Sequence, residues 1–162
     1  AVQLAMGDAF AMSLQVARGF TAKDFAQYHP GGALGKQLYL KVSHIYPNNE
    51  CPRVTPSATV REIILEITSK RLGMTAVVDD DKLIGIITDG DLRRMLEREE
   101  HTKHLIATDI MSHGPKSIDP DQMAIEALSI MTKYSITQLL VASDGAYKGV
   151  IHLHDLIREG LG

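Results

Sequence analysis

The residues best placed to do chemistry are a threonine and an aspartate three positions apart, Thr88 and Asp91. They follow an apolar run that begins at Gly85, whose missing side chain lets another group approach the backbone closely. Where a strand becomes a helix, the Thr88 hydroxyl and the free backbone N–H groups can meet a phosphate. The Asp91 carboxylate can accept two hydrogen bonds from a ribose diol. The same residues also fit a structural role, with Thr88 as the N-cap of the helix and Asp91 as a first-turn acid.

A second motif of the same form lies near the end of the chain, but a histidine replaces the threonine. Gly149 precedes His152, and Asp155 follows three residues later. A neutral imidazole still donates one hydrogen bond, and a protonated one pairs with phosphate or carboxylate, so we expect two non-equivalent sites. His152 and His154 have the spacing of a metal pair on one face of a strand. No cysteine or third histidine lies near them in the sequence, and we predict no metal site.

Both motifs belong to an internal repeat that must position them. Shifting the sequence by 64 residues aligns Val54–Arg94 with Ile118–Arg158 without a gap. In the first copy, Ser57 is the expected helix cap and Gly73 the expected left-handed stop. Between them, apolar residues with helical spacing form a stripe: Val60, Ile63, Ile64 and Ile67.

Two strands and a second helix complete each copy. We expect strands at Thr75–Val78 and Leu83–Ile87, and their counterparts at Leu139–Ala142 and Lys148–Ile151. The acidic run 79–81 lacks the spacing of an EF-hand and is a hairpin turn. Each copy therefore has the order strand–helix–strand–strand–helix, and the fold class is α/β (α+β). A unit of about 60 residues buries little surface alone, so the copies should pack on each other.

Residues 1–43 precede the repeat and have a different character. Val2–Ala17 is apolar on nearly every side, which indicates a helix buried in a larger body. Thr21 and Asp24 have the spacing of a capped short helix. The first residues show neither an initiator methionine nor a signal peptide, so we expect the chain to be a piece of a longer protein. We expect residues 1–43 to be partly disordered or packed against another copy.

Composition limits the possible classes of protein. The chain has 162 residues, a net charge of −3 and 44% hydrophobic residues, which suits one ordinary domain or two small ones. This charge argues against a nucleic-acid surface, and no apolar run approaches the roughly 20 residues that cross a bilayer. A single cysteine, Cys51, excludes an internal disulfide. We therefore expect a cytoplasmic protein that binds neither nucleic acid nor membrane.

The repeat resembles a tandem CBS domain, also called a Bateman module. The resemblance rests on the signatures Gly85–Leu92 and Gly149–Leu156, which have the form Gly-Φ-Φ-Thr-x-x-Asp-Leu with Φ apolar, although His152 replaces the second threonine. It implies two units, 44–105 and 106–162, related by a pseudo-twofold axis. The clefts between such units commonly hold adenosine or other nucleotides.

The segment before the repeat is similar to the end of the sugar isomerase (SIS) domain of bacterial D-arabinose 5-phosphate isomerases. The similarity rests on Leu4–Ala9, Ala17–Thr21 and His29–Lys36, and it continues through both units. That family interconverts D-ribulose 5-phosphate and D-arabinose 5-phosphate on the route to the Kdo sugar of lipopolysaccharide. The resemblance implies that residues 1–43 are a remnant of the SIS domain and that His29 is a catalytic acid–base residue. The family's other catalytic groups would lie upstream, so we expect this piece to be inactive alone and to require no cofactor.

The resemblance also implies a regulatory ligand, either CMP-Kdo, as the feedback ligand of that pathway, or an adenine nucleotide. Asp91 would bind the ribose and Thr88 the phosphate. Three residues are candidates for the sugar acid: Arg53, Lys133 and His154. The other residues expected at the clefts are Met74, Thr75, Gly85, His152 and Asp155.

A second hypothesis belongs to another class: the pair binds no ligand and holds the isomerase together as a homo-oligomer. The apolar stripe Val60, Ile63, Ile64 and Ile67 would then be a contact face or a core face.

Overall fold

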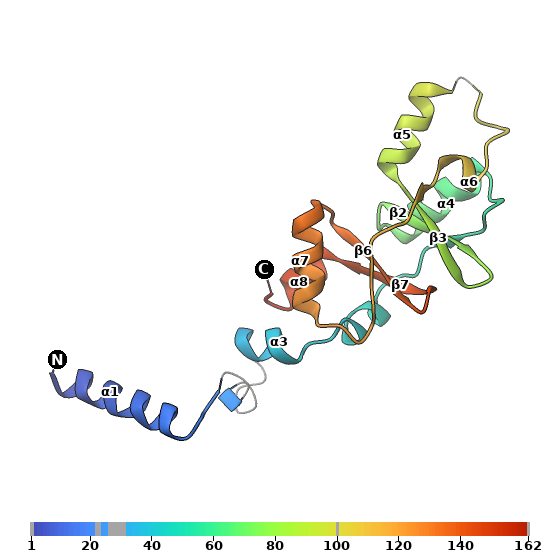
Figure 1. The fold of residues 1–162 in the computed structure, drawn as a ribbon. Coiled ribbons are helices and arrows are strands. Elements are labelled where there is room, and N and C mark those ends of the chain that lie inside the picture. Colours follow the sequence, from blue (N-terminus) through green and yellow to red (C-terminus); the bar gives the residue numbers. More distant parts are fainter. Residues whose placement is uncertain (1, 22–23, 26–31, 100, 162) are drawn as a thin grey trace.

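The computed structural model of the chain describes residues 2–21, 24–25, 32–99 and 101–161, and it contains two copies of one unit (Figure 1). The first unit comprises β1 (Arg53–Val54), α4 (Val60–Lys70), β2 (Met74–Asp79), β3 (Lys82–Thr88) and α5 (Asp89–Arg98). The second unit comprises β5 (Ser117–Ile118), α7 (Ala124–Tyr134), β6 (Gln138–Ser143), β7 (Ala146–His152) and α8 (Leu153–Arg158). The predicted order of elements and the α/β fold class are confirmed.

The strands of both units form one seven-stranded sheet in the order β1-β2-β3-β7-β6-β5, and β4 (Ser112–His113) pairs with β3. The two hairpins meet where they turn. The Leu83 N–H donates to the Gly145 carbonyl, and the Tyr147 N–H donates to the Asp81 carbonyl, each at 2.9 Å. A shift of 64 residues converts one of these bonds into the other, so a pseudo-twofold axis passes between the hairpins.

The repeat extends to local irregularities of the backbone. A β-bulge follows Val77 in the first unit and Val141 in the second, which are equivalent positions. The predicted hairpin turn is present: Asp80 and Asp81 have left-handed φ angles of 44° and 67°, as a type I′ turn requires.

Both ends of α4 differ from the sequence-based prediction. Thr59, not Ser57, is its N-cap, because Glu62 completes a capping box with Thr59: the Thr59 N–H donates to Glu62 Oε2 at 2.7 Å. The helix ends on Arg71, which itself takes the left-handed conformation with φ of 58°. Gly73 is also left-handed, but it lies in the turn into β2 and is not the helix stop.

Each unit has its own apolar core, and a third cluster joins the units. The first core includes Ile63, Ile67, Val77, Ile87 and Met95, and the second includes Met131, Leu139, Val141, Ile151 and Leu156. The joining cluster contains Met74, Ala76, Val78, Leu140, Tyr147 and Val150, so the units pack on each other as predicted. The α4 stripe is divided: Ile63 and Ile67 belong to the core, whereas Ile64 is 42% exposed.

The segment before each unit packs on the other unit. Residues 40–43 lead into the first unit, but the Val42 N–H donates to the Gln122 carbonyl of the second unit at 2.9 Å. In the same way, the Ala107 N–H precedes the second unit and donates to the Ala58 carbonyl of the first at 2.9 Å. The short elements of these segments are α3 (Ala33–Tyr39), α6 (Ala107–Ile110) and the 3₁₀ helices η1 (Val42–His44) and η2 (Tyr46–Asn48).

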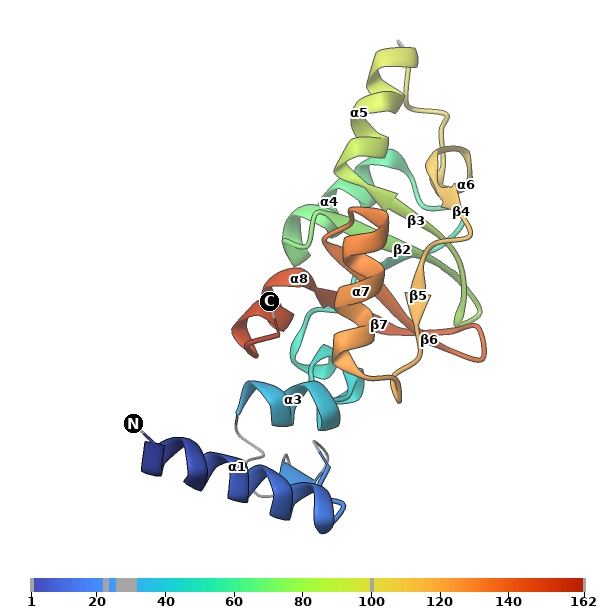
Figure 2. The same ribbon diagram turned by 60° about the vertical axis from the view of Figure 1, so that its left-hand side comes forward.

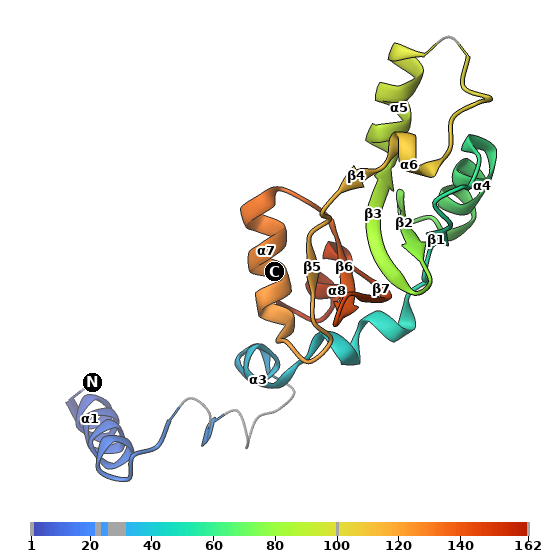
Figure 3. The same cartoon turned by 45° about the vertical axis from the view of Figure 1, so that its right-hand side comes forward.

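The first helix, α1 (Val2–Ala17), lies apart from the sheet in three views (Figures 1, 2 and 3). All its residues are exposed within the described chain, so the described residues do not form the larger body expected to cover it, and its burial stays a prediction. Its exposed large apolar side chains are Val2, Leu4, Met6, Phe10, Met12, Leu14 and Val16. The predicted capping contact after it is present, because the Thr21 N–H donates to Asp24 Oδ2 at 2.7 Å. In the described residues, no helix combines the length and apolar character that a membrane span requires.

Candidate functional site

The first predicted pair lies where β3 meets α5. Thr88 is the N-cap of α5, and its Oγ1 accepts a hydrogen bond from the Asp91 N–H at 3.2 Å. In return, Asp91 Oδ2 accepts from the Thr88 N–H at 2.8 Å and from the Thr88 hydroxyl at 2.6 Å. Thr88 and Asp91 therefore form a capping box, which is the structural role that the sequence left open, and such a cap stabilises a helix by about 1 kcal/mol. The ligand-binding roles of the two residues stay predictions.

The second oxygen of Asp91 is also engaged within the protein. Asp91 Oδ1 accepts from the Ser112 hydroxyl at 3.3 Å and pairs with the Arg94 guanidinium, and the residue is only 8% exposed. Burial raises the pKa of Asp91, but the hydrogen bonds from Thr88 and the neighbouring Arg94 outweigh burial and hold the pKa below its ordinary value. Asp91 is therefore ionised at neutral pH, and a ribose hydroxyl reaches it only by replacing one of these partners.

The second predicted pair repeats this arrangement where β7 meets α8. His152 Nδ1 accepts from the His154 N–H at 3.1 Å, and Asp155 Oδ2 accepts from the His152 N–H at 2.9 Å. Asn49, from the segment before the first unit, donates to the same Asp155 oxygen at 2.7 Å. Burial and the nearby His154 lower the pKa of His152, against the opposing effect of Asp155. The imidazole is therefore neutral at neutral pH, with Nδ1 as acceptor and Nε2 as donor.

A pocket of about 430 Å³ lies between the units, next to His152. We call it the inter-unit pocket; its lining residues are Ile67, Thr68, Arg71, Leu72, Gly73, Asp89, Gln138 and His152. At this pocket Gln138 of the second unit is hydrogen-bonded to the first unit, since its Nε2 donates to the Leu72 carbonyl at 3.0 Å. The pocket thus combines one guanidinium, one carboxylate, one amide and one imidazole in a space large enough for a small ligand.

Another pocket, of about 410 Å³, lies beside Asp91 and is lined by residues of α5, of α6 and of the segments next to them. Its charged lining residues are Asp91, Arg94, Arg98, Glu99 and Asp109. Three carboxylates against two guanidinium groups make this pocket less favourable for an anion than the inter-unit pocket.

Several predicted residues make their contacts elsewhere. Met74 and Thr75 are fully buried in β2, so they face no open cleft. The Arg53 guanidinium lies 5.6 Å from the Tyr147 ring centre, and Lys133 Nζ lies 5.4 Å from the ring centre of Tyr134.

The signature glycines also serve contacts within the protein. A side chain on Gly85 would overlap Met111 Sδ, and a Cβ on Gly149 would stand 2.8 Å from Tyr46 Cδ2. Each glycine therefore leaves room for the segment that leads into the other unit. The predicted catalytic residue, His29, lies outside the described residues.

His154 is exposed at the start of α8, with its ring centre 4.8 Å from that of His152 in an edge-to-face contact. Within the described ranges, no group of three or more His, Cys, Asp or Glu residues is arranged to hold a metal ion.

Of the residues that line the inter-unit pocket, sequence reasoning placed only His152 at a cleft, and the charged and amide groups that it missed are Arg71, Asp89 and Gln138. They come from the end of α4, the start of α5 and the start of β6, and no short motif connects them. One signal was available, because Asp89 lies inside the first signature, directly after Thr88.

Comparisons with known proteins agree with this fold. A family model described as CBS domain matches residues 42–98 and 107–162. Arabinose 5-phosphate isomerase KdsD of Escherichia coli (strain K12) is 46% identical over 160 residues, which are 98% of this chain and 49% of that protein. The chain therefore spans about half the length of the curated relatives it matches.

Two solved structures share the fold at lower identity. CBSX2 in complex with AMP has a TM-score of 0.62 and 21% identity, and the match covers 75% of this chain and 96% of that one. The CBS domain protein PAE2072 from Pyrobaculum aerophilum, complexed with AMP, has a TM-score of 0.64 and 19% identity, over 72% and 90% of the two chains.

Proposed function

Since this chain belongs to the CBS-domain family and carries two CBS units, we propose that it is a regulatory module that binds a nucleotide or nucleotide-sugar between them. One observation carries the proposal, namely the set of side chains in the inter-unit pocket. The Arg71 guanidinium suits a phosphate, and the Asp89 carboxylate suits sugar hydroxyls. Gln138 and the Nε2–H of His152 can hydrogen-bond a base or a further phosphate oxygen. The AMP in both structural neighbours supports a nucleotide as the ligand class.

The finer proposal is that the module controls an arabinose 5-phosphate isomerase, with residues 1–43 as the end of its SIS domain. The identity of 46% with KdsD supports it, and so does the exposed apolar surface of α1, which suits contact with a larger body. In that protein His29 would take part in the proton transfer. CMP-Kdo is then the logical feedback ligand, because that isomerase family acts on the route to Kdo, and Arg71 could pair with either its phosphate or its sugar acid.

Calorimetric titration of the chain with AMP, ATP and CMP-Kdo tests the proposal. We expect at least one of them to bind, and Arg71→Gln to weaken that binding about ten- to a hundredfold, the range for a charge-assisted hydrogen bond. Arg61→Gln is the matched control, since Arg61 lies on the same helix, is exposed, and does not line the inter-unit pocket. Absence of heat from all three compounds, or equal effects of the two substitutions, would contradict the proposal.

A second candidate function is oligomerisation, and the surface of α4 favours it. An apolar groove of about 600 Å³ is lined by Thr59, Val60, Arg61, Ile64, Leu65, Thr102 and Lys103. Ile64 and Leu65 are 42% and 58% exposed. If this face joins two copies, the double substitution Ile64→Lys and Leu65→Lys should lower the molar mass measured by light scattering. An unchanged mass would remove this candidate.

A further inference from the structure

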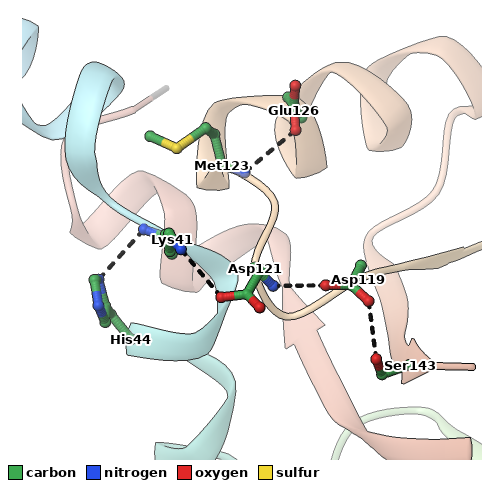
Figure 4. A network of polar contacts seen from close by, with 7 residues as sticks. All are labelled: Lys41, His44, Asp119, Asp121, Met123, Glu126 and Ser143. Atoms are coloured by element: carbon green, nitrogen blue, oxygen red, sulfur yellow. Dashed lines mark hydrogen bonds and ion pairs between the residues drawn. The ribbon is translucent and has the colours of Figure 1, made fainter.

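Residues 32–43, which we call the lead-in, are attached to the second unit by two ion pairs as well as by backbone bonds. Lys36 Nζ of α3 lies 2.8 Å from Glu159 Oε2, directly after α8, and both side chains are about one-third exposed. Lys41 Nζ lies 3.0 Å from Asp121 Oδ1, before α7 (Figure 4). The lead-in therefore touches the second unit at the end of one helix and before the start of another.

The helix α8 connects this contact with the inter-unit pocket. His152 lines the pocket and is the N-cap of α8, where its Nδ1 accepts from the His154 N–H, while Glu159 follows the last residue of the helix. The helix has six residues and so spans about 9 Å. A helix this short has few internal hydrogen bonds, so the loss of its cap weakens the whole element and not only its first turn.

We propose that α8 transmits the state of the inter-unit pocket to the lead-in helix α3. A ligand atom that accepts a hydrogen bond from His152 Nε2–H fixes the ring in its capping orientation. The cap then orders α8, and an ordered α8 holds Glu159 against Lys36. The proposal rests on the proposed function, since it states how occupancy of the same pocket reaches the segment that precedes the CBS units.

Among the described residues, the first unit's second helix, α5, packs against α6 before the second unit and not against α3. Its cap, Thr88, begins α5, which lies at the far end of the molecule from α3 in Figures 1, 2 and 3. The two units therefore differ in what their caps can influence. The caps also differ in detail, since Thr88 accepts from the N–H of Asp91, the third residue of α5, and His152 accepts from the N–H of His154, the second residue of α8. Only the cap at His152 is expected to act on the lead-in.

Hydrogen–deuterium exchange of the full 162-residue chain tests this connection without any ligand. We expect His152→Ala to speed exchange about fivefold in both 153–159 and 33–40, the factor that corresponds to a cap of about 1 kcal/mol. His152→Thr should restore slow exchange in both, because a threonine, Thr88, is the N-cap at the equivalent position of α5. In a Glu159→Gln background, His152→Ala should still affect 153–158 but no longer 33–40.

Two matched controls separate transmission from general loosening. Lys41→Met removes the other ion pair of the lead-in and should leave the effect of His152→Ala on 33–40 intact. Thr88→Ala removes the first unit's cap and should affect 89–98 but not 33–40. The proposal is overturned if His152→Ala speeds exchange in 153–159 alone, or if Thr88→Ala changes 33–40 equally.

Saturating AMP adds an independent arm, in which exchange in 33–40 should slow in the wild-type chain and not in Glu159→Gln. Binding of AMP with no change in 33–40 would also overturn the proposal. If calorimetry shows no nucleotide binding at all, the proposed function fails, whereas the substitutions still decide whether α8 and α3 are coupled.

Discussion

Replacing Gly85 by alanine tests whether the segment before the second unit, which contains Met111, packs on the first unit as closely as the structure shows. A Cβ at this position would overlap Met111 Sδ and stand 2.9 Å from Met111 Cγ. Without that neighbour, alanine would be neutral or stabilising by up to about 1 kcal/mol, because glycine loses more conformational entropy on folding. With it, the methionine must move or β3 and β4 must separate, and such overpacking costs about 1–3 kcal/mol.

The assay is urea denaturation, with thermal unfolding as a second measurement. Gly85→Ala should lower the free energy of unfolding by about 1–2 kcal/mol and the Tm by roughly 2–8 °C. Adding Met111→Ala should remove most of this cost, which a double-mutant cycle would show as a coupling energy of about 1 kcal/mol or more. Gly90→Ala is the control, since its nearest neighbour, Arg94 Nη1, lies 3.4 Å from the new Cβ. If Gly85→Ala costs as much without the methionine as with it, the close packing inferred here is refuted.

The equivalent substitution in the second unit, Gly149→Ala, should cost more when measured in the same denaturation assay, because the Tyr46 ring 2.8 Å from the new Cβ is stiffer than a methionine. Ile63→Ala should lower the free energy of unfolding by about 2–5 kcal/mol, since Ile63 is fully buried, whereas Ile64→Ala should cost less than about 1 kcal/mol. Burial lowers the pKa of His152 in the folded chain, so the unfolded chain binds more protons and stability should fall as the pH drops below about 6.5. Between pH 8 and pH 5, the Tm of the wild type should therefore fall by more than the Tm of His152→Thr. A difference in Tm between the two that stays constant over this range would contradict the lowered pKa of His152.

The arrangement within each unit could be predicted from the sequence because the signal is local and occurs twice. Apolar spacing marks the helices, and the 64-residue shift places the same strand, turn and helix starts in both copies. The boundary errors have a local cause as well. Ser57 and Thr59 are both acceptable caps, and only the reach of Glu62 back to Thr59 decides between them.

Two features could not be predicted, because they depend on how the two units pair: the packing of the segment before each unit on the other unit, and the inter-unit pocket. Nothing in the residues around Val42 or Ala107 says which unit they will contact. Thr88 and Asp91 illustrate a further difficulty: a hydroxyl and a carboxylate three residues apart are what a capping box requires and also what a ribose phosphate requires. Geometry shows that both residues already serve the cap, which the sequence alone could not show.

The pseudo-twofold axis relates the backbones of the two units, but the side chains at related positions differ. This difference determines how many nucleotide sites one chain has. Positions related by the 64-residue shift to Arg71, Asp89 and Gln138 hold Ser135, Leu153 and Met74. The opposite side of the axis therefore lacks the guanidinium, the carboxylate and the amide together, and it carries a threonine, Thr88, where the inter-unit pocket has His152. Since these charged and amide groups provide the proposed affinity for a phosphorylated ligand, one chain should bind one nucleotide. A calorimetric stoichiometry of two equal sites per chain would show that the backbone symmetry, and not these side chains, governs binding.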